Sequence, residues 1–268
     1  MAINALQSAA TGLSALNTAL DVTSNNLANI NTDGFKTSRP NFQDLYYIEK
    51  ARPGVMNANG DSTPTGLYVG LGVKVSGTQL DFEQGAPKAT GRTLDVMIEG
   101  NGFLRVQVDP SIGDGTGYTR AGNLAINKDG EICMANDEGR RLEPIISIPE
   151  NAEGIEITTD GRVLVTIPGQ VDTQDVGQIE LTTFINPQGL KQVGENLYVE
   201  TEGSGTPISG LPGEDNRGQI QQGFLEASNT DPTRELIDLI RIQRAFEMNS
   251  QTIRAADETL RSIANLRR

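Results

Sequence analysis

The two ends of this 268-residue chain carry apolar residues at helical spacing, and this pattern constrains the fold more than any other feature. From residue 3 to residue 30 there is no proline and a single glycine, Gly12. Apolar or small side chains recur at alternating intervals of three and four, which is typical of a helix that pairs with another helix. These positions, the N-terminal seam, are Leu6, Ala9, Leu13, Leu16, Leu20, Thr23, Leu27 and Ile30.

The C-terminal end repeats this pattern. Asp231 followed by Pro232 predicts a helix start, because aspartate is a common N-cap and proline fits the first helical position. The positions of this C-terminal seam are Leu239, Ile242, Phe246, Asn249, Ile253, Ala256, Leu260 and Ile263. The simplest way to bury both seams is against each other, as a coiled coil. The alternative is that two ordinary amphipathic helices pack on the central part of the chain.

The polar face of the N-terminal helix is almost free of charge. Asp21 is the one charged side chain between residues 1 and 32, and the remaining polar residues are Asn, Gln, Ser and Thr. A helix face in water normally carries Lys and Glu, whereas uncharged groups can be covered by protein at a lower desolvation cost. We therefore expect this helix to be surrounded by neighbouring subunits, and the terminus to be disordered before assembly.

The middle of the chain predicts a β domain. It has short apolar runs separated by glycine and proline, and Asp129-Gly130 and Asp160-Gly161 between such runs indicate hairpins. The expected strands lie within residues 73–82, 95–108, 124–127, 155–158, 163–167, 178–184 and 197–200. The predicted fold class is α+β, with long terminal helices that pair as a coiled coil and a central, mainly antiparallel β domain. The predicted parts are helical residues 1–35 with 229–268, extended connecting segments 36–74 with 203–228, and a β domain at 75–202.

Composition excludes several classes of function. A net charge of −13 is unfavourable for contact with nucleic-acid phosphates. There is no apolar run long enough to span a membrane, and the first residues lack the basic and apolar regions of a cleavable signal peptide, which alone would indicate the cytosol. The chain has no histidine, so Ser-His and Cys-His nucleophile pairs are absent. We expect no enzymatic activity, no metal site and no cofactor, and a buried apolar role for Cys133 beside Ile132 and Met134.

Several stretches resemble the bacterial flagellar rod and hook family. They are SNNLANINTDGFK at 24–36, DVMIEGNGF at 95–103, YTRAGN at 118–123, GENLY at 194–198 and QRAFE at 243–247. They occur in the family's order over nearly the whole chain. Within the family, the length and the segment 51–73 resemble a distal rod subunit more than a hook subunit or the smallest rod subunits.

This resemblance implies a structural subunit that assembles into a tubular drive shaft and transmits torque from the motor to the hook. The terminal helices would line the tube and the β domain would face outward. The implied partners are further copies of the chain, proximal rod proteins, the hook protein, the surrounding P- and L-ring proteins, the rod cap and the flagellar type III export apparatus. Nucleic acid is not among them, and the chain would not be embedded in a membrane. The implied location is the periplasm-spanning rod of the basal body, reached by export without a cleavable signal peptide.

The resemblance also assigns roles to particular residues. By position, the motif residues that end the first helix and turn the chain outward are Asn26, Asn29, Asn31, Gly34 and Phe35. Gly34 is expected to be a left-handed C-cap, with Phe35 as an apolar anchor after it. The stretch 52–66 is expected to lock adjacent subunits and to stiffen the polymer. Its turn residues are Pro53, Gly54, Pro64 and Gly66.

Three other functions remain open on the sequence alone. A proximal rod or hook subunit of the same family would share these patterns but differ in its position in the basal body. An extracellular carbohydrate-active β protein with helical ends would bind or cleave a glycan through one or two of the many carboxylates. A cytosolic coiled-coil adaptor would have stable terminal helices as a monomer.

Overall fold

The structure, a computed structural model, describes residues 2–54, 64–169 and 172–266, with the backbone alone at positions 2, 3, 263 and 266. The predicted stiffening stretch therefore lies largely outside the described residues, at 55–63. By its contacts the chain divides into two units. Unit 1 comprises residues 1–28, 38–80 and 231–268, and unit 2 comprises residues 29–37 and 81–230.

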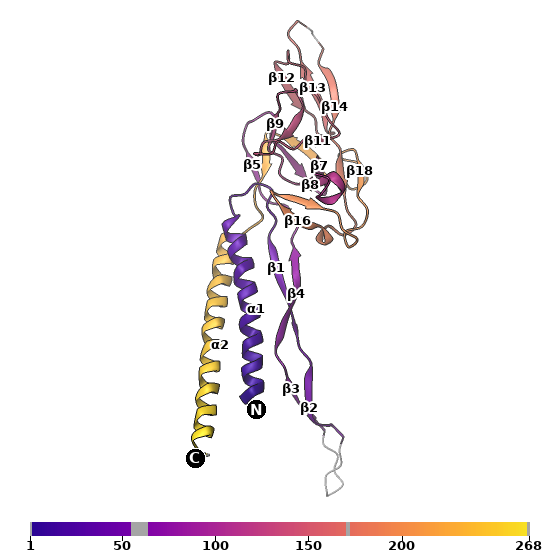
Figure 1. The fold of residues 1–268 in the computed structure, drawn as a ribbon. Helices are drawn as coiled ribbons and strands as arrows, with labels where there is room; N and C mark the ends of the chain where they lie inside the picture. Colours follow the sequence, from indigo (N-terminus) through magenta and orange to yellow (C-terminus); the bar gives the residue numbers. More distant parts are fainter. Residues whose placement is uncertain (1, 55–63, 170–171, 267–268) are drawn as a thin grey trace. The chain divides into compact units, whose positions relative to one another are not determined.

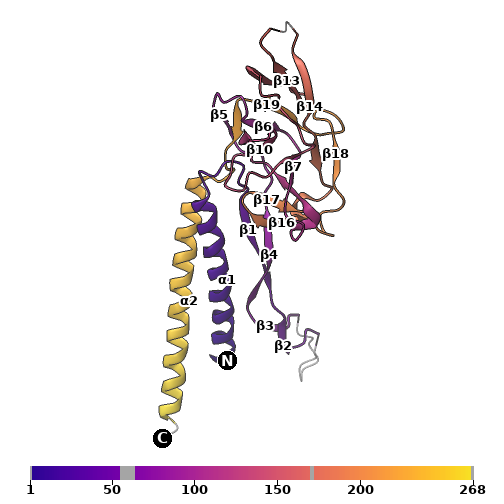
Figure 2. The same ribbon diagram turned by 45° about the horizontal axis from the view of Figure 1, so that its top comes forward.

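Unit 1 contains the two long helices, α1 at Ala2–Ala28 and α2 at Pro232–Leu266. They lie side by side in both views (Figures 1 and 2) and pack against each other. The predicted start of α2 is confirmed, because the Asp231 carboxylate accepts hydrogen bonds from the amides of Thr233, at 2.9 Å, and Arg234, at 3.4 Å. These bonds satisfy amides that a helix start leaves without an internal acceptor.

A long hairpin completes unit 1. Its strands are β1 at Ser38–Asp44, β2 at Tyr47–Ala51, β3 at Leu67–Gly70 and β4 at Val73–Leu80. β1 pairs with β4 and β2 with β3, both antiparallel (Figure 1). Helix α1 packs against β1 and β4, where Thr11 accepts a hydrogen bond from the Val73 amide at 3.3 Å. The hairpin thus covers part of the uncharged polar face of α1 within a single chain.

In the part that the structure describes, unit 2 is built from short strands and two 3-10 turns. The strands of its first half are β5 at Pro87–Ala89, β6 at Val96–Glu99, β7 at Phe103–Gln107, β8 at Thr116–Thr119, β9 at Leu124–Ile126, β10 at Ile132–Met134 and β11 at Leu142–Glu143. Those of its second half are β12 at Gly154–Ile157, β13 at Arg162–Thr166, β14 at Gln174–Gln178, β15 at Leu181–Thr183, β16 at Lys191–Gly194, β17 at Leu197–Val199, β18 at Ile208–Gly210, β19 at Gln219–Gln222 and β20 at Phe224–Glu226. The 3-10 turns are Gly113–Gly115 and Pro187–Gly189.

The strand pairs among the described residues of unit 2 are all antiparallel. The largest sheet has the order β16-β17-β8-β7-β15-β18, with β11 added beside β7. β12, β13 and β14 form a second sheet, and β9 pairs with β10, β6 with β19 and β5 with β20. The core between them is aliphatic, with Leu104, Val106, Leu124, Val163 and Leu181 fully buried. The fold class is α+β, with a central, mainly antiparallel β region as predicted.

Several local predictions are confirmed and two segments differ from expectation. Asp129-Gly130 and Asp160-Gly161 each join paired strands, and Cys133 is buried, which raises the pKa of its thiol. The segments predicted as extended connections carry strands instead. Segment 36–74 forms β1 to β3 in unit 1, and segment 203–228 forms β18 to β20 in unit 2. In the first segment β2 pairs with β3 and β1 with β4, as one hairpin. In the second segment β18, β19 and β20 pair with β15, β6 and β5, which are distant in sequence, so local patterns do not reveal the pairing.

Candidate assembly site on the terminal helices

The C-terminal seam lies on the side of α2 that faces α1. Leu239, Ile242, Ile253 and Leu260 are half-buried, whereas most residues on the other sides of α2 are exposed. Phe246 is only partly covered, with 40% of its surface exposed. The side chain of Ile263 lies outside the described part of the structure. The spacing of three and four therefore selected the partly covered side of this helix, as expected for a heptad pattern.

On α1 the most buried positions are small residues rather than the large residues of the seam. Leu6, Leu13, Leu16, Leu20 and Leu27 are half-buried, as is Ile30 beyond the helix. The fully buried residues are Ala9, Ala15, Ala19, Thr23 and Asn26. Ala15 and Ala19 were not part of the prediction. Small residues separated by four positions let another element approach closely, and this spacing is the signal that could have identified them.

A groove runs between the helices at the level of Leu20. It has a volume of about 260 Å³ and is mostly apolar. Its lining residues are Leu16, Asn17, Leu20, Ile242, Gln243, Phe246 and Glu247. The pair of helices therefore does not fill the space between its own leucine and isoleucine side chains.

Helix α2 also exposes large apolar side chains that α1 does not cover. Leu236, Ile237 and Ile240 are each nearly half exposed, and Met248 is 62% exposed. These four residues form a surface that we call the α2 outer stripe. Exposed apolar residues are common singly, but several within a few helical turns mark a surface that contacts another molecule.

Asn26 joins three elements of unit 1. Its amide nitrogen donates to the Ser38 carbonyl at 2.8 Å and to the Glu235 carboxylate at 3.2 Å, and its amide oxygen accepts from the Ser38 amide at 3.0 Å. The end of α1, the start of β1 and the first turn of α2 are thereby held together. Burial raises the pKa of the Glu235 carboxyl, and the hydrogen bond from Asn26 opposes this shift.

The other motif residues lie in unit 2. Helix α1 ends at Ala28, so the expectation that Gly34 caps it is wrong. Gly34 does have the predicted left-handed backbone, with φ at +75°. It lies in a turn after the helix, where its amide donates to the Glu226 carbonyl at 2.7 Å. A side chain at Gly34 would lie 2.8 Å from the Ala121 backbone nitrogen. Phe35 is buried, Asn29 accepts a hydrogen bond from the Thr32 hydroxyl, and Asn31 is exposed.

The far part of the hairpin is aromatic and exposed. Tyr46 is 90% exposed, and Tyr47, Leu67 and Tyr68 are each at least half exposed. The residues that border positions 55–63 are also exposed, and they include Pro53, Gly54 and Pro64. Gly66 lies in a tight place, because a side chain there would meet the Tyr68 ring at 2.7 Å and the Ala51 carbonyl at 2.9 Å.

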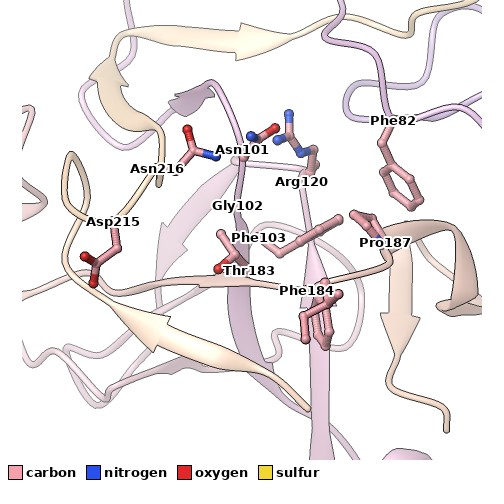
Figure 3. A pocket seen from close by; sticks show the side chains of 11 residues that line it. Phe82, Asn101, Gly102, Phe103, Arg120, Thr183, Phe184, Pro187, Asp215 and Asn216 are labelled. Carbon is pink, nitrogen blue, oxygen red and sulfur yellow. The ribbon is translucent and has the colours of Figure 1, made fainter. Parts of the chain in front are cut away.

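A pocket of about 360 Å³ in unit 2 offers little catalytic chemistry. Figure 3 shows the rings of Phe82, Phe103 and Phe184 and the side chains of Arg120 and Asp215 around it. Asp215 is its one carboxylate, is largely exposed and pairs with Arg217 at 3.3 Å. Within the described residues there is no group of three potential metal ligands, and no helix is long and apolar enough to cross a membrane.

Three family models match the chain in the order of its elements. Residues 6–36 match the flagella basal body rod protein model, residues 97–165 the D1 domain of the flagellar hook protein FlgE/F/G, and residues 221–266 the C-terminal model of the flagellar basal body rod FlgEFG proteins. The flagellar basal-body rod protein FlgG of Caulobacter vibrioides is 43% identical over 99% of this chain and 100% of the relative.

The chain belongs to the FlgG family of flagellar basal-body rod proteins. FlgG proteins of other bacteria are also similar to this chain. The protein of Borreliella burgdorferi is 39% identical over 99% of both chains, and that of Bacillus subtilis is 37% identical over 99% of this chain and 100% of the relative. Because these matches extend over nearly the full chain, the FlgG family assignment covers both helices and the β region.

A solved structure, the Helicobacter pylori flagellar hook protein FlgE2, is also similar. It is 14% identical, covers 71% of this chain and 56% of that chain, and has a TM-score of 0.25.

Proposed function

We propose that this chain is the distal rod subunit of a bacterial flagellum, and that it polymerises through its terminal helices into a rigid tube that transmits torque from motor to hook. In this role α1 and α2 pair as a coiled coil, and pairs from neighbouring copies pack around the bore. The single observation that carries the proposal is the α2 outer stripe. Its large apolar side chains stay exposed after α1 and α2 have packed together.

The distribution of charge supports assembly through unit 1. Unit 1 has 11 basic and 10 acidic residues, whereas unit 2 has 11 basic and 25 acidic residues, so the net charges are +1 and −14. Nearly neutral helices can be brought together without strong repulsion, while the acidic unit repels its own copies. Close packing is therefore favoured at the helices, and solubility is favoured at the β unit.

The hairpin is proposed to connect neighbouring copies. Its exposed tyrosines offer large apolar area together with hydroxyl groups, a combination that is common at protein interfaces. Contacts of this segment, including Pro53, Gly54, Pro64 and Gly66, would restrict bending between subunits. The open helical arrangement follows when a head-to-tail contact repeats without closing on itself.

The wider partners follow from this role. In a distal rod the chain would contact proximal rod proteins on one side and the hook protein on the other, with the P- and L-ring proteins around it. It would be delivered by the flagellar type III export apparatus, without a cleaved signal peptide, and assembled under the rod cap in the periplasm. It has no catalytic role in this proposal.

Electron microscopy of the purified full chain tests the proposal. The full chain is expected to form tubes, and a variant that lacks residues 1–30 is expected to form none because α2 has lost its partner helix. Circular dichroism of both proteins controls for loss of the β unit. Tubes of unchanged number and diameter from the shortened chain would contradict assembly through the terminal helices.

A further inference from the structure

Unit 2 buries three charged side chains in one cluster. Lys36, Arg120 and Glu226 are each at most 4% exposed. The Lys36 ammonium group donates to Glu226 Oε1 at 2.5 Å and to the Glu83 carbonyl at 2.7 Å. The Arg120 guanidinium donates to Glu226 Oε2 at 3.2 Å and to the Gly100 carbonyl, and lies over the Phe103 ring. We call Lys36, Arg120 and Glu226 the Glu226 cluster.

The backbone closes around the same carboxylate. The Gly85 amide donates to Glu226 Oε1 at 2.9 Å, and the Ala227 amide donates to the Ala86 carbonyl at 3.0 Å. Asn229 accepts from the Thr37 amide at 2.8 Å and donates to the Asp81 carbonyl at 2.9 Å. Segments near residues 36 and 85 therefore complete their hydrogen bonds only when residues 226–229 are in place.

Glu226 supplies the one negative charge of the cluster, whose formal net charge is +1 with this carboxylate and +2 without it. Two cations share one carboxylate, and among the described residues no second carboxylate forms an ion pair with Lys36 or Arg120. Burial lowers the pKa of Lys36, and Glu226 is the main group that opposes this effect. Removing the partner of a buried ion is strongly destabilising, because an uncompensated charge is left away from water.

Glu226 comes late in the chain. It is 190 residues after Lys36 and 106 residues after Arg120. When the N-terminus is made or transported first, both cations are present long before the carboxylate that permits their burial. They can stay in water until then, because an isolated cation gains nothing from an apolar interior.

We propose that Glu226 controls the closing of unit 2: the β unit cannot bury Lys36 and Arg120, and so stays open, until the carboxylate of residue 226 arrives. Unit 2 can then close only after residue 226 is available, when the part of the chain that still follows is mainly α2. The device keeps the early segments solvated during synthesis or passage through a channel. It goes beyond the proposed rod function, since it concerns the folding of a single chain and holds whether or not the chain polymerises.

The test is refolding of the full chain from urea, followed by pulse-labelled hydrogen exchange of the β7 and β8 amides and of Gly85. In the unchanged protein these amides are expected to become protected in one common phase. Glu226→Gln keeps an acceptor for the Gly85 amide but removes the charge. It is expected to slow this phase roughly hundredfold, or to prevent it, because the charge is needed in the rate-limiting step.

Two further variants separate charge compensation from simple packing. The first is a triple variant that combines Glu226→Gln with Lys36→Met and Arg120→Met. It removes the cations that require the carboxylate, so the rate should return to within about threefold of the unchanged protein. Glu180→Gln, which removes a half-exposed partner of Arg105 in the same unit, should leave the rate unchanged.

Three results would overturn the proposal. One is refolding of Glu226→Gln at the unchanged rate. Another is a triple variant as slow, or as unable to fold, as the single variant, which would assign the carboxylate a role other than charge compensation. The third is protection of β7 and β8 in a phase that precedes protection of Gly85.

Discussion

Replacing Leu20 with glutamate is expected to abolish polymerisation while the β unit stays folded. Leu20 is a half-buried member of the N-terminal seam and lines the groove beside Ile242 and Phe246. A carboxylate there would be desolvated without a cation within the groove, at a cost of roughly several kcal/mol for each helix pair. Because every subunit repeats the defect, the fraction of protein that sediments as polymer should fall by more than about tenfold.

An exposed isoleucine in unit 2 provides the matched control. Ile185 is 80% exposed, and Ile185→Glu makes the same kind of change, from an apolar side chain to a carboxylate, outside the terminal helices. This variant should sediment as the unchanged protein does, and both variants should show the same urea unfolding of the β unit. If Leu20→Glu polymerises as well as Ile185→Glu, the groove between the helices is not part of the assembly surface.

Replacing Gly122 with alanine is expected to destabilise unit 2 by about 3 kcal/mol or more. A side chain at Gly122 would lie 1.7 Å from the Val96 carbonyl oxygen, and that contact involves backbone. The two segments cannot separate easily, because the Val96 amide donates to the Gly122 carbonyl at 2.9 Å. Urea unfolding followed by far-ultraviolet circular dichroism measures the loss.

Gly154 in β12 is the control for this prediction. A side chain there would meet Thr166 at 3.7 Å, an ordinary van der Waals contact, and its backbone has no positive φ. Gly154→Ala should therefore change the unfolding midpoint little. Equal midpoints for Gly122→Ala and Gly154→Ala would show that the close approach at Gly122 relaxes without cost.

The sequence predicted the helices well because a heptad period depends on local spacing alone. It identified the side of α2 that faces α1, through Leu239, Ile242, Ile253 and Leu260. On α1 it did not find Ala15 and Ala19, because this helix packs against both α2 and the hairpin. A helix with two covered sides has no single apolar stripe, so the period of large residues describes only part of its contacts.

The Glu226 cluster could not be predicted from the sequence. Lys36 and Arg120 stand in stretches that resemble the family, but each alone is typical of a solvent-exposed cation. Their burial depends on Glu226, which is distant in sequence and reaches them through the pairing of β20 with β5. Gly34 has the left-handed backbone that was expected, but its amide bonds to the carbonyl of the same distant residue, Glu226. Such long-range pairs are set by topology rather than by local pattern.

Oxidative footprinting of Met248 tests the central claim most directly. This residue is 62% exposed on the α2 outer stripe, whereas Met97 and Met134 are buried in unit 2 and serve as internal references. If copies of the chain cover the stripe, Met248 should be oxidised readily in dilute monomer and become protected in the polymer, while the two references stay unchanged. Equal oxidation of Met248 in monomer and polymer, or a chain that remains monomeric at high concentration, would contradict assembly through the terminal helices.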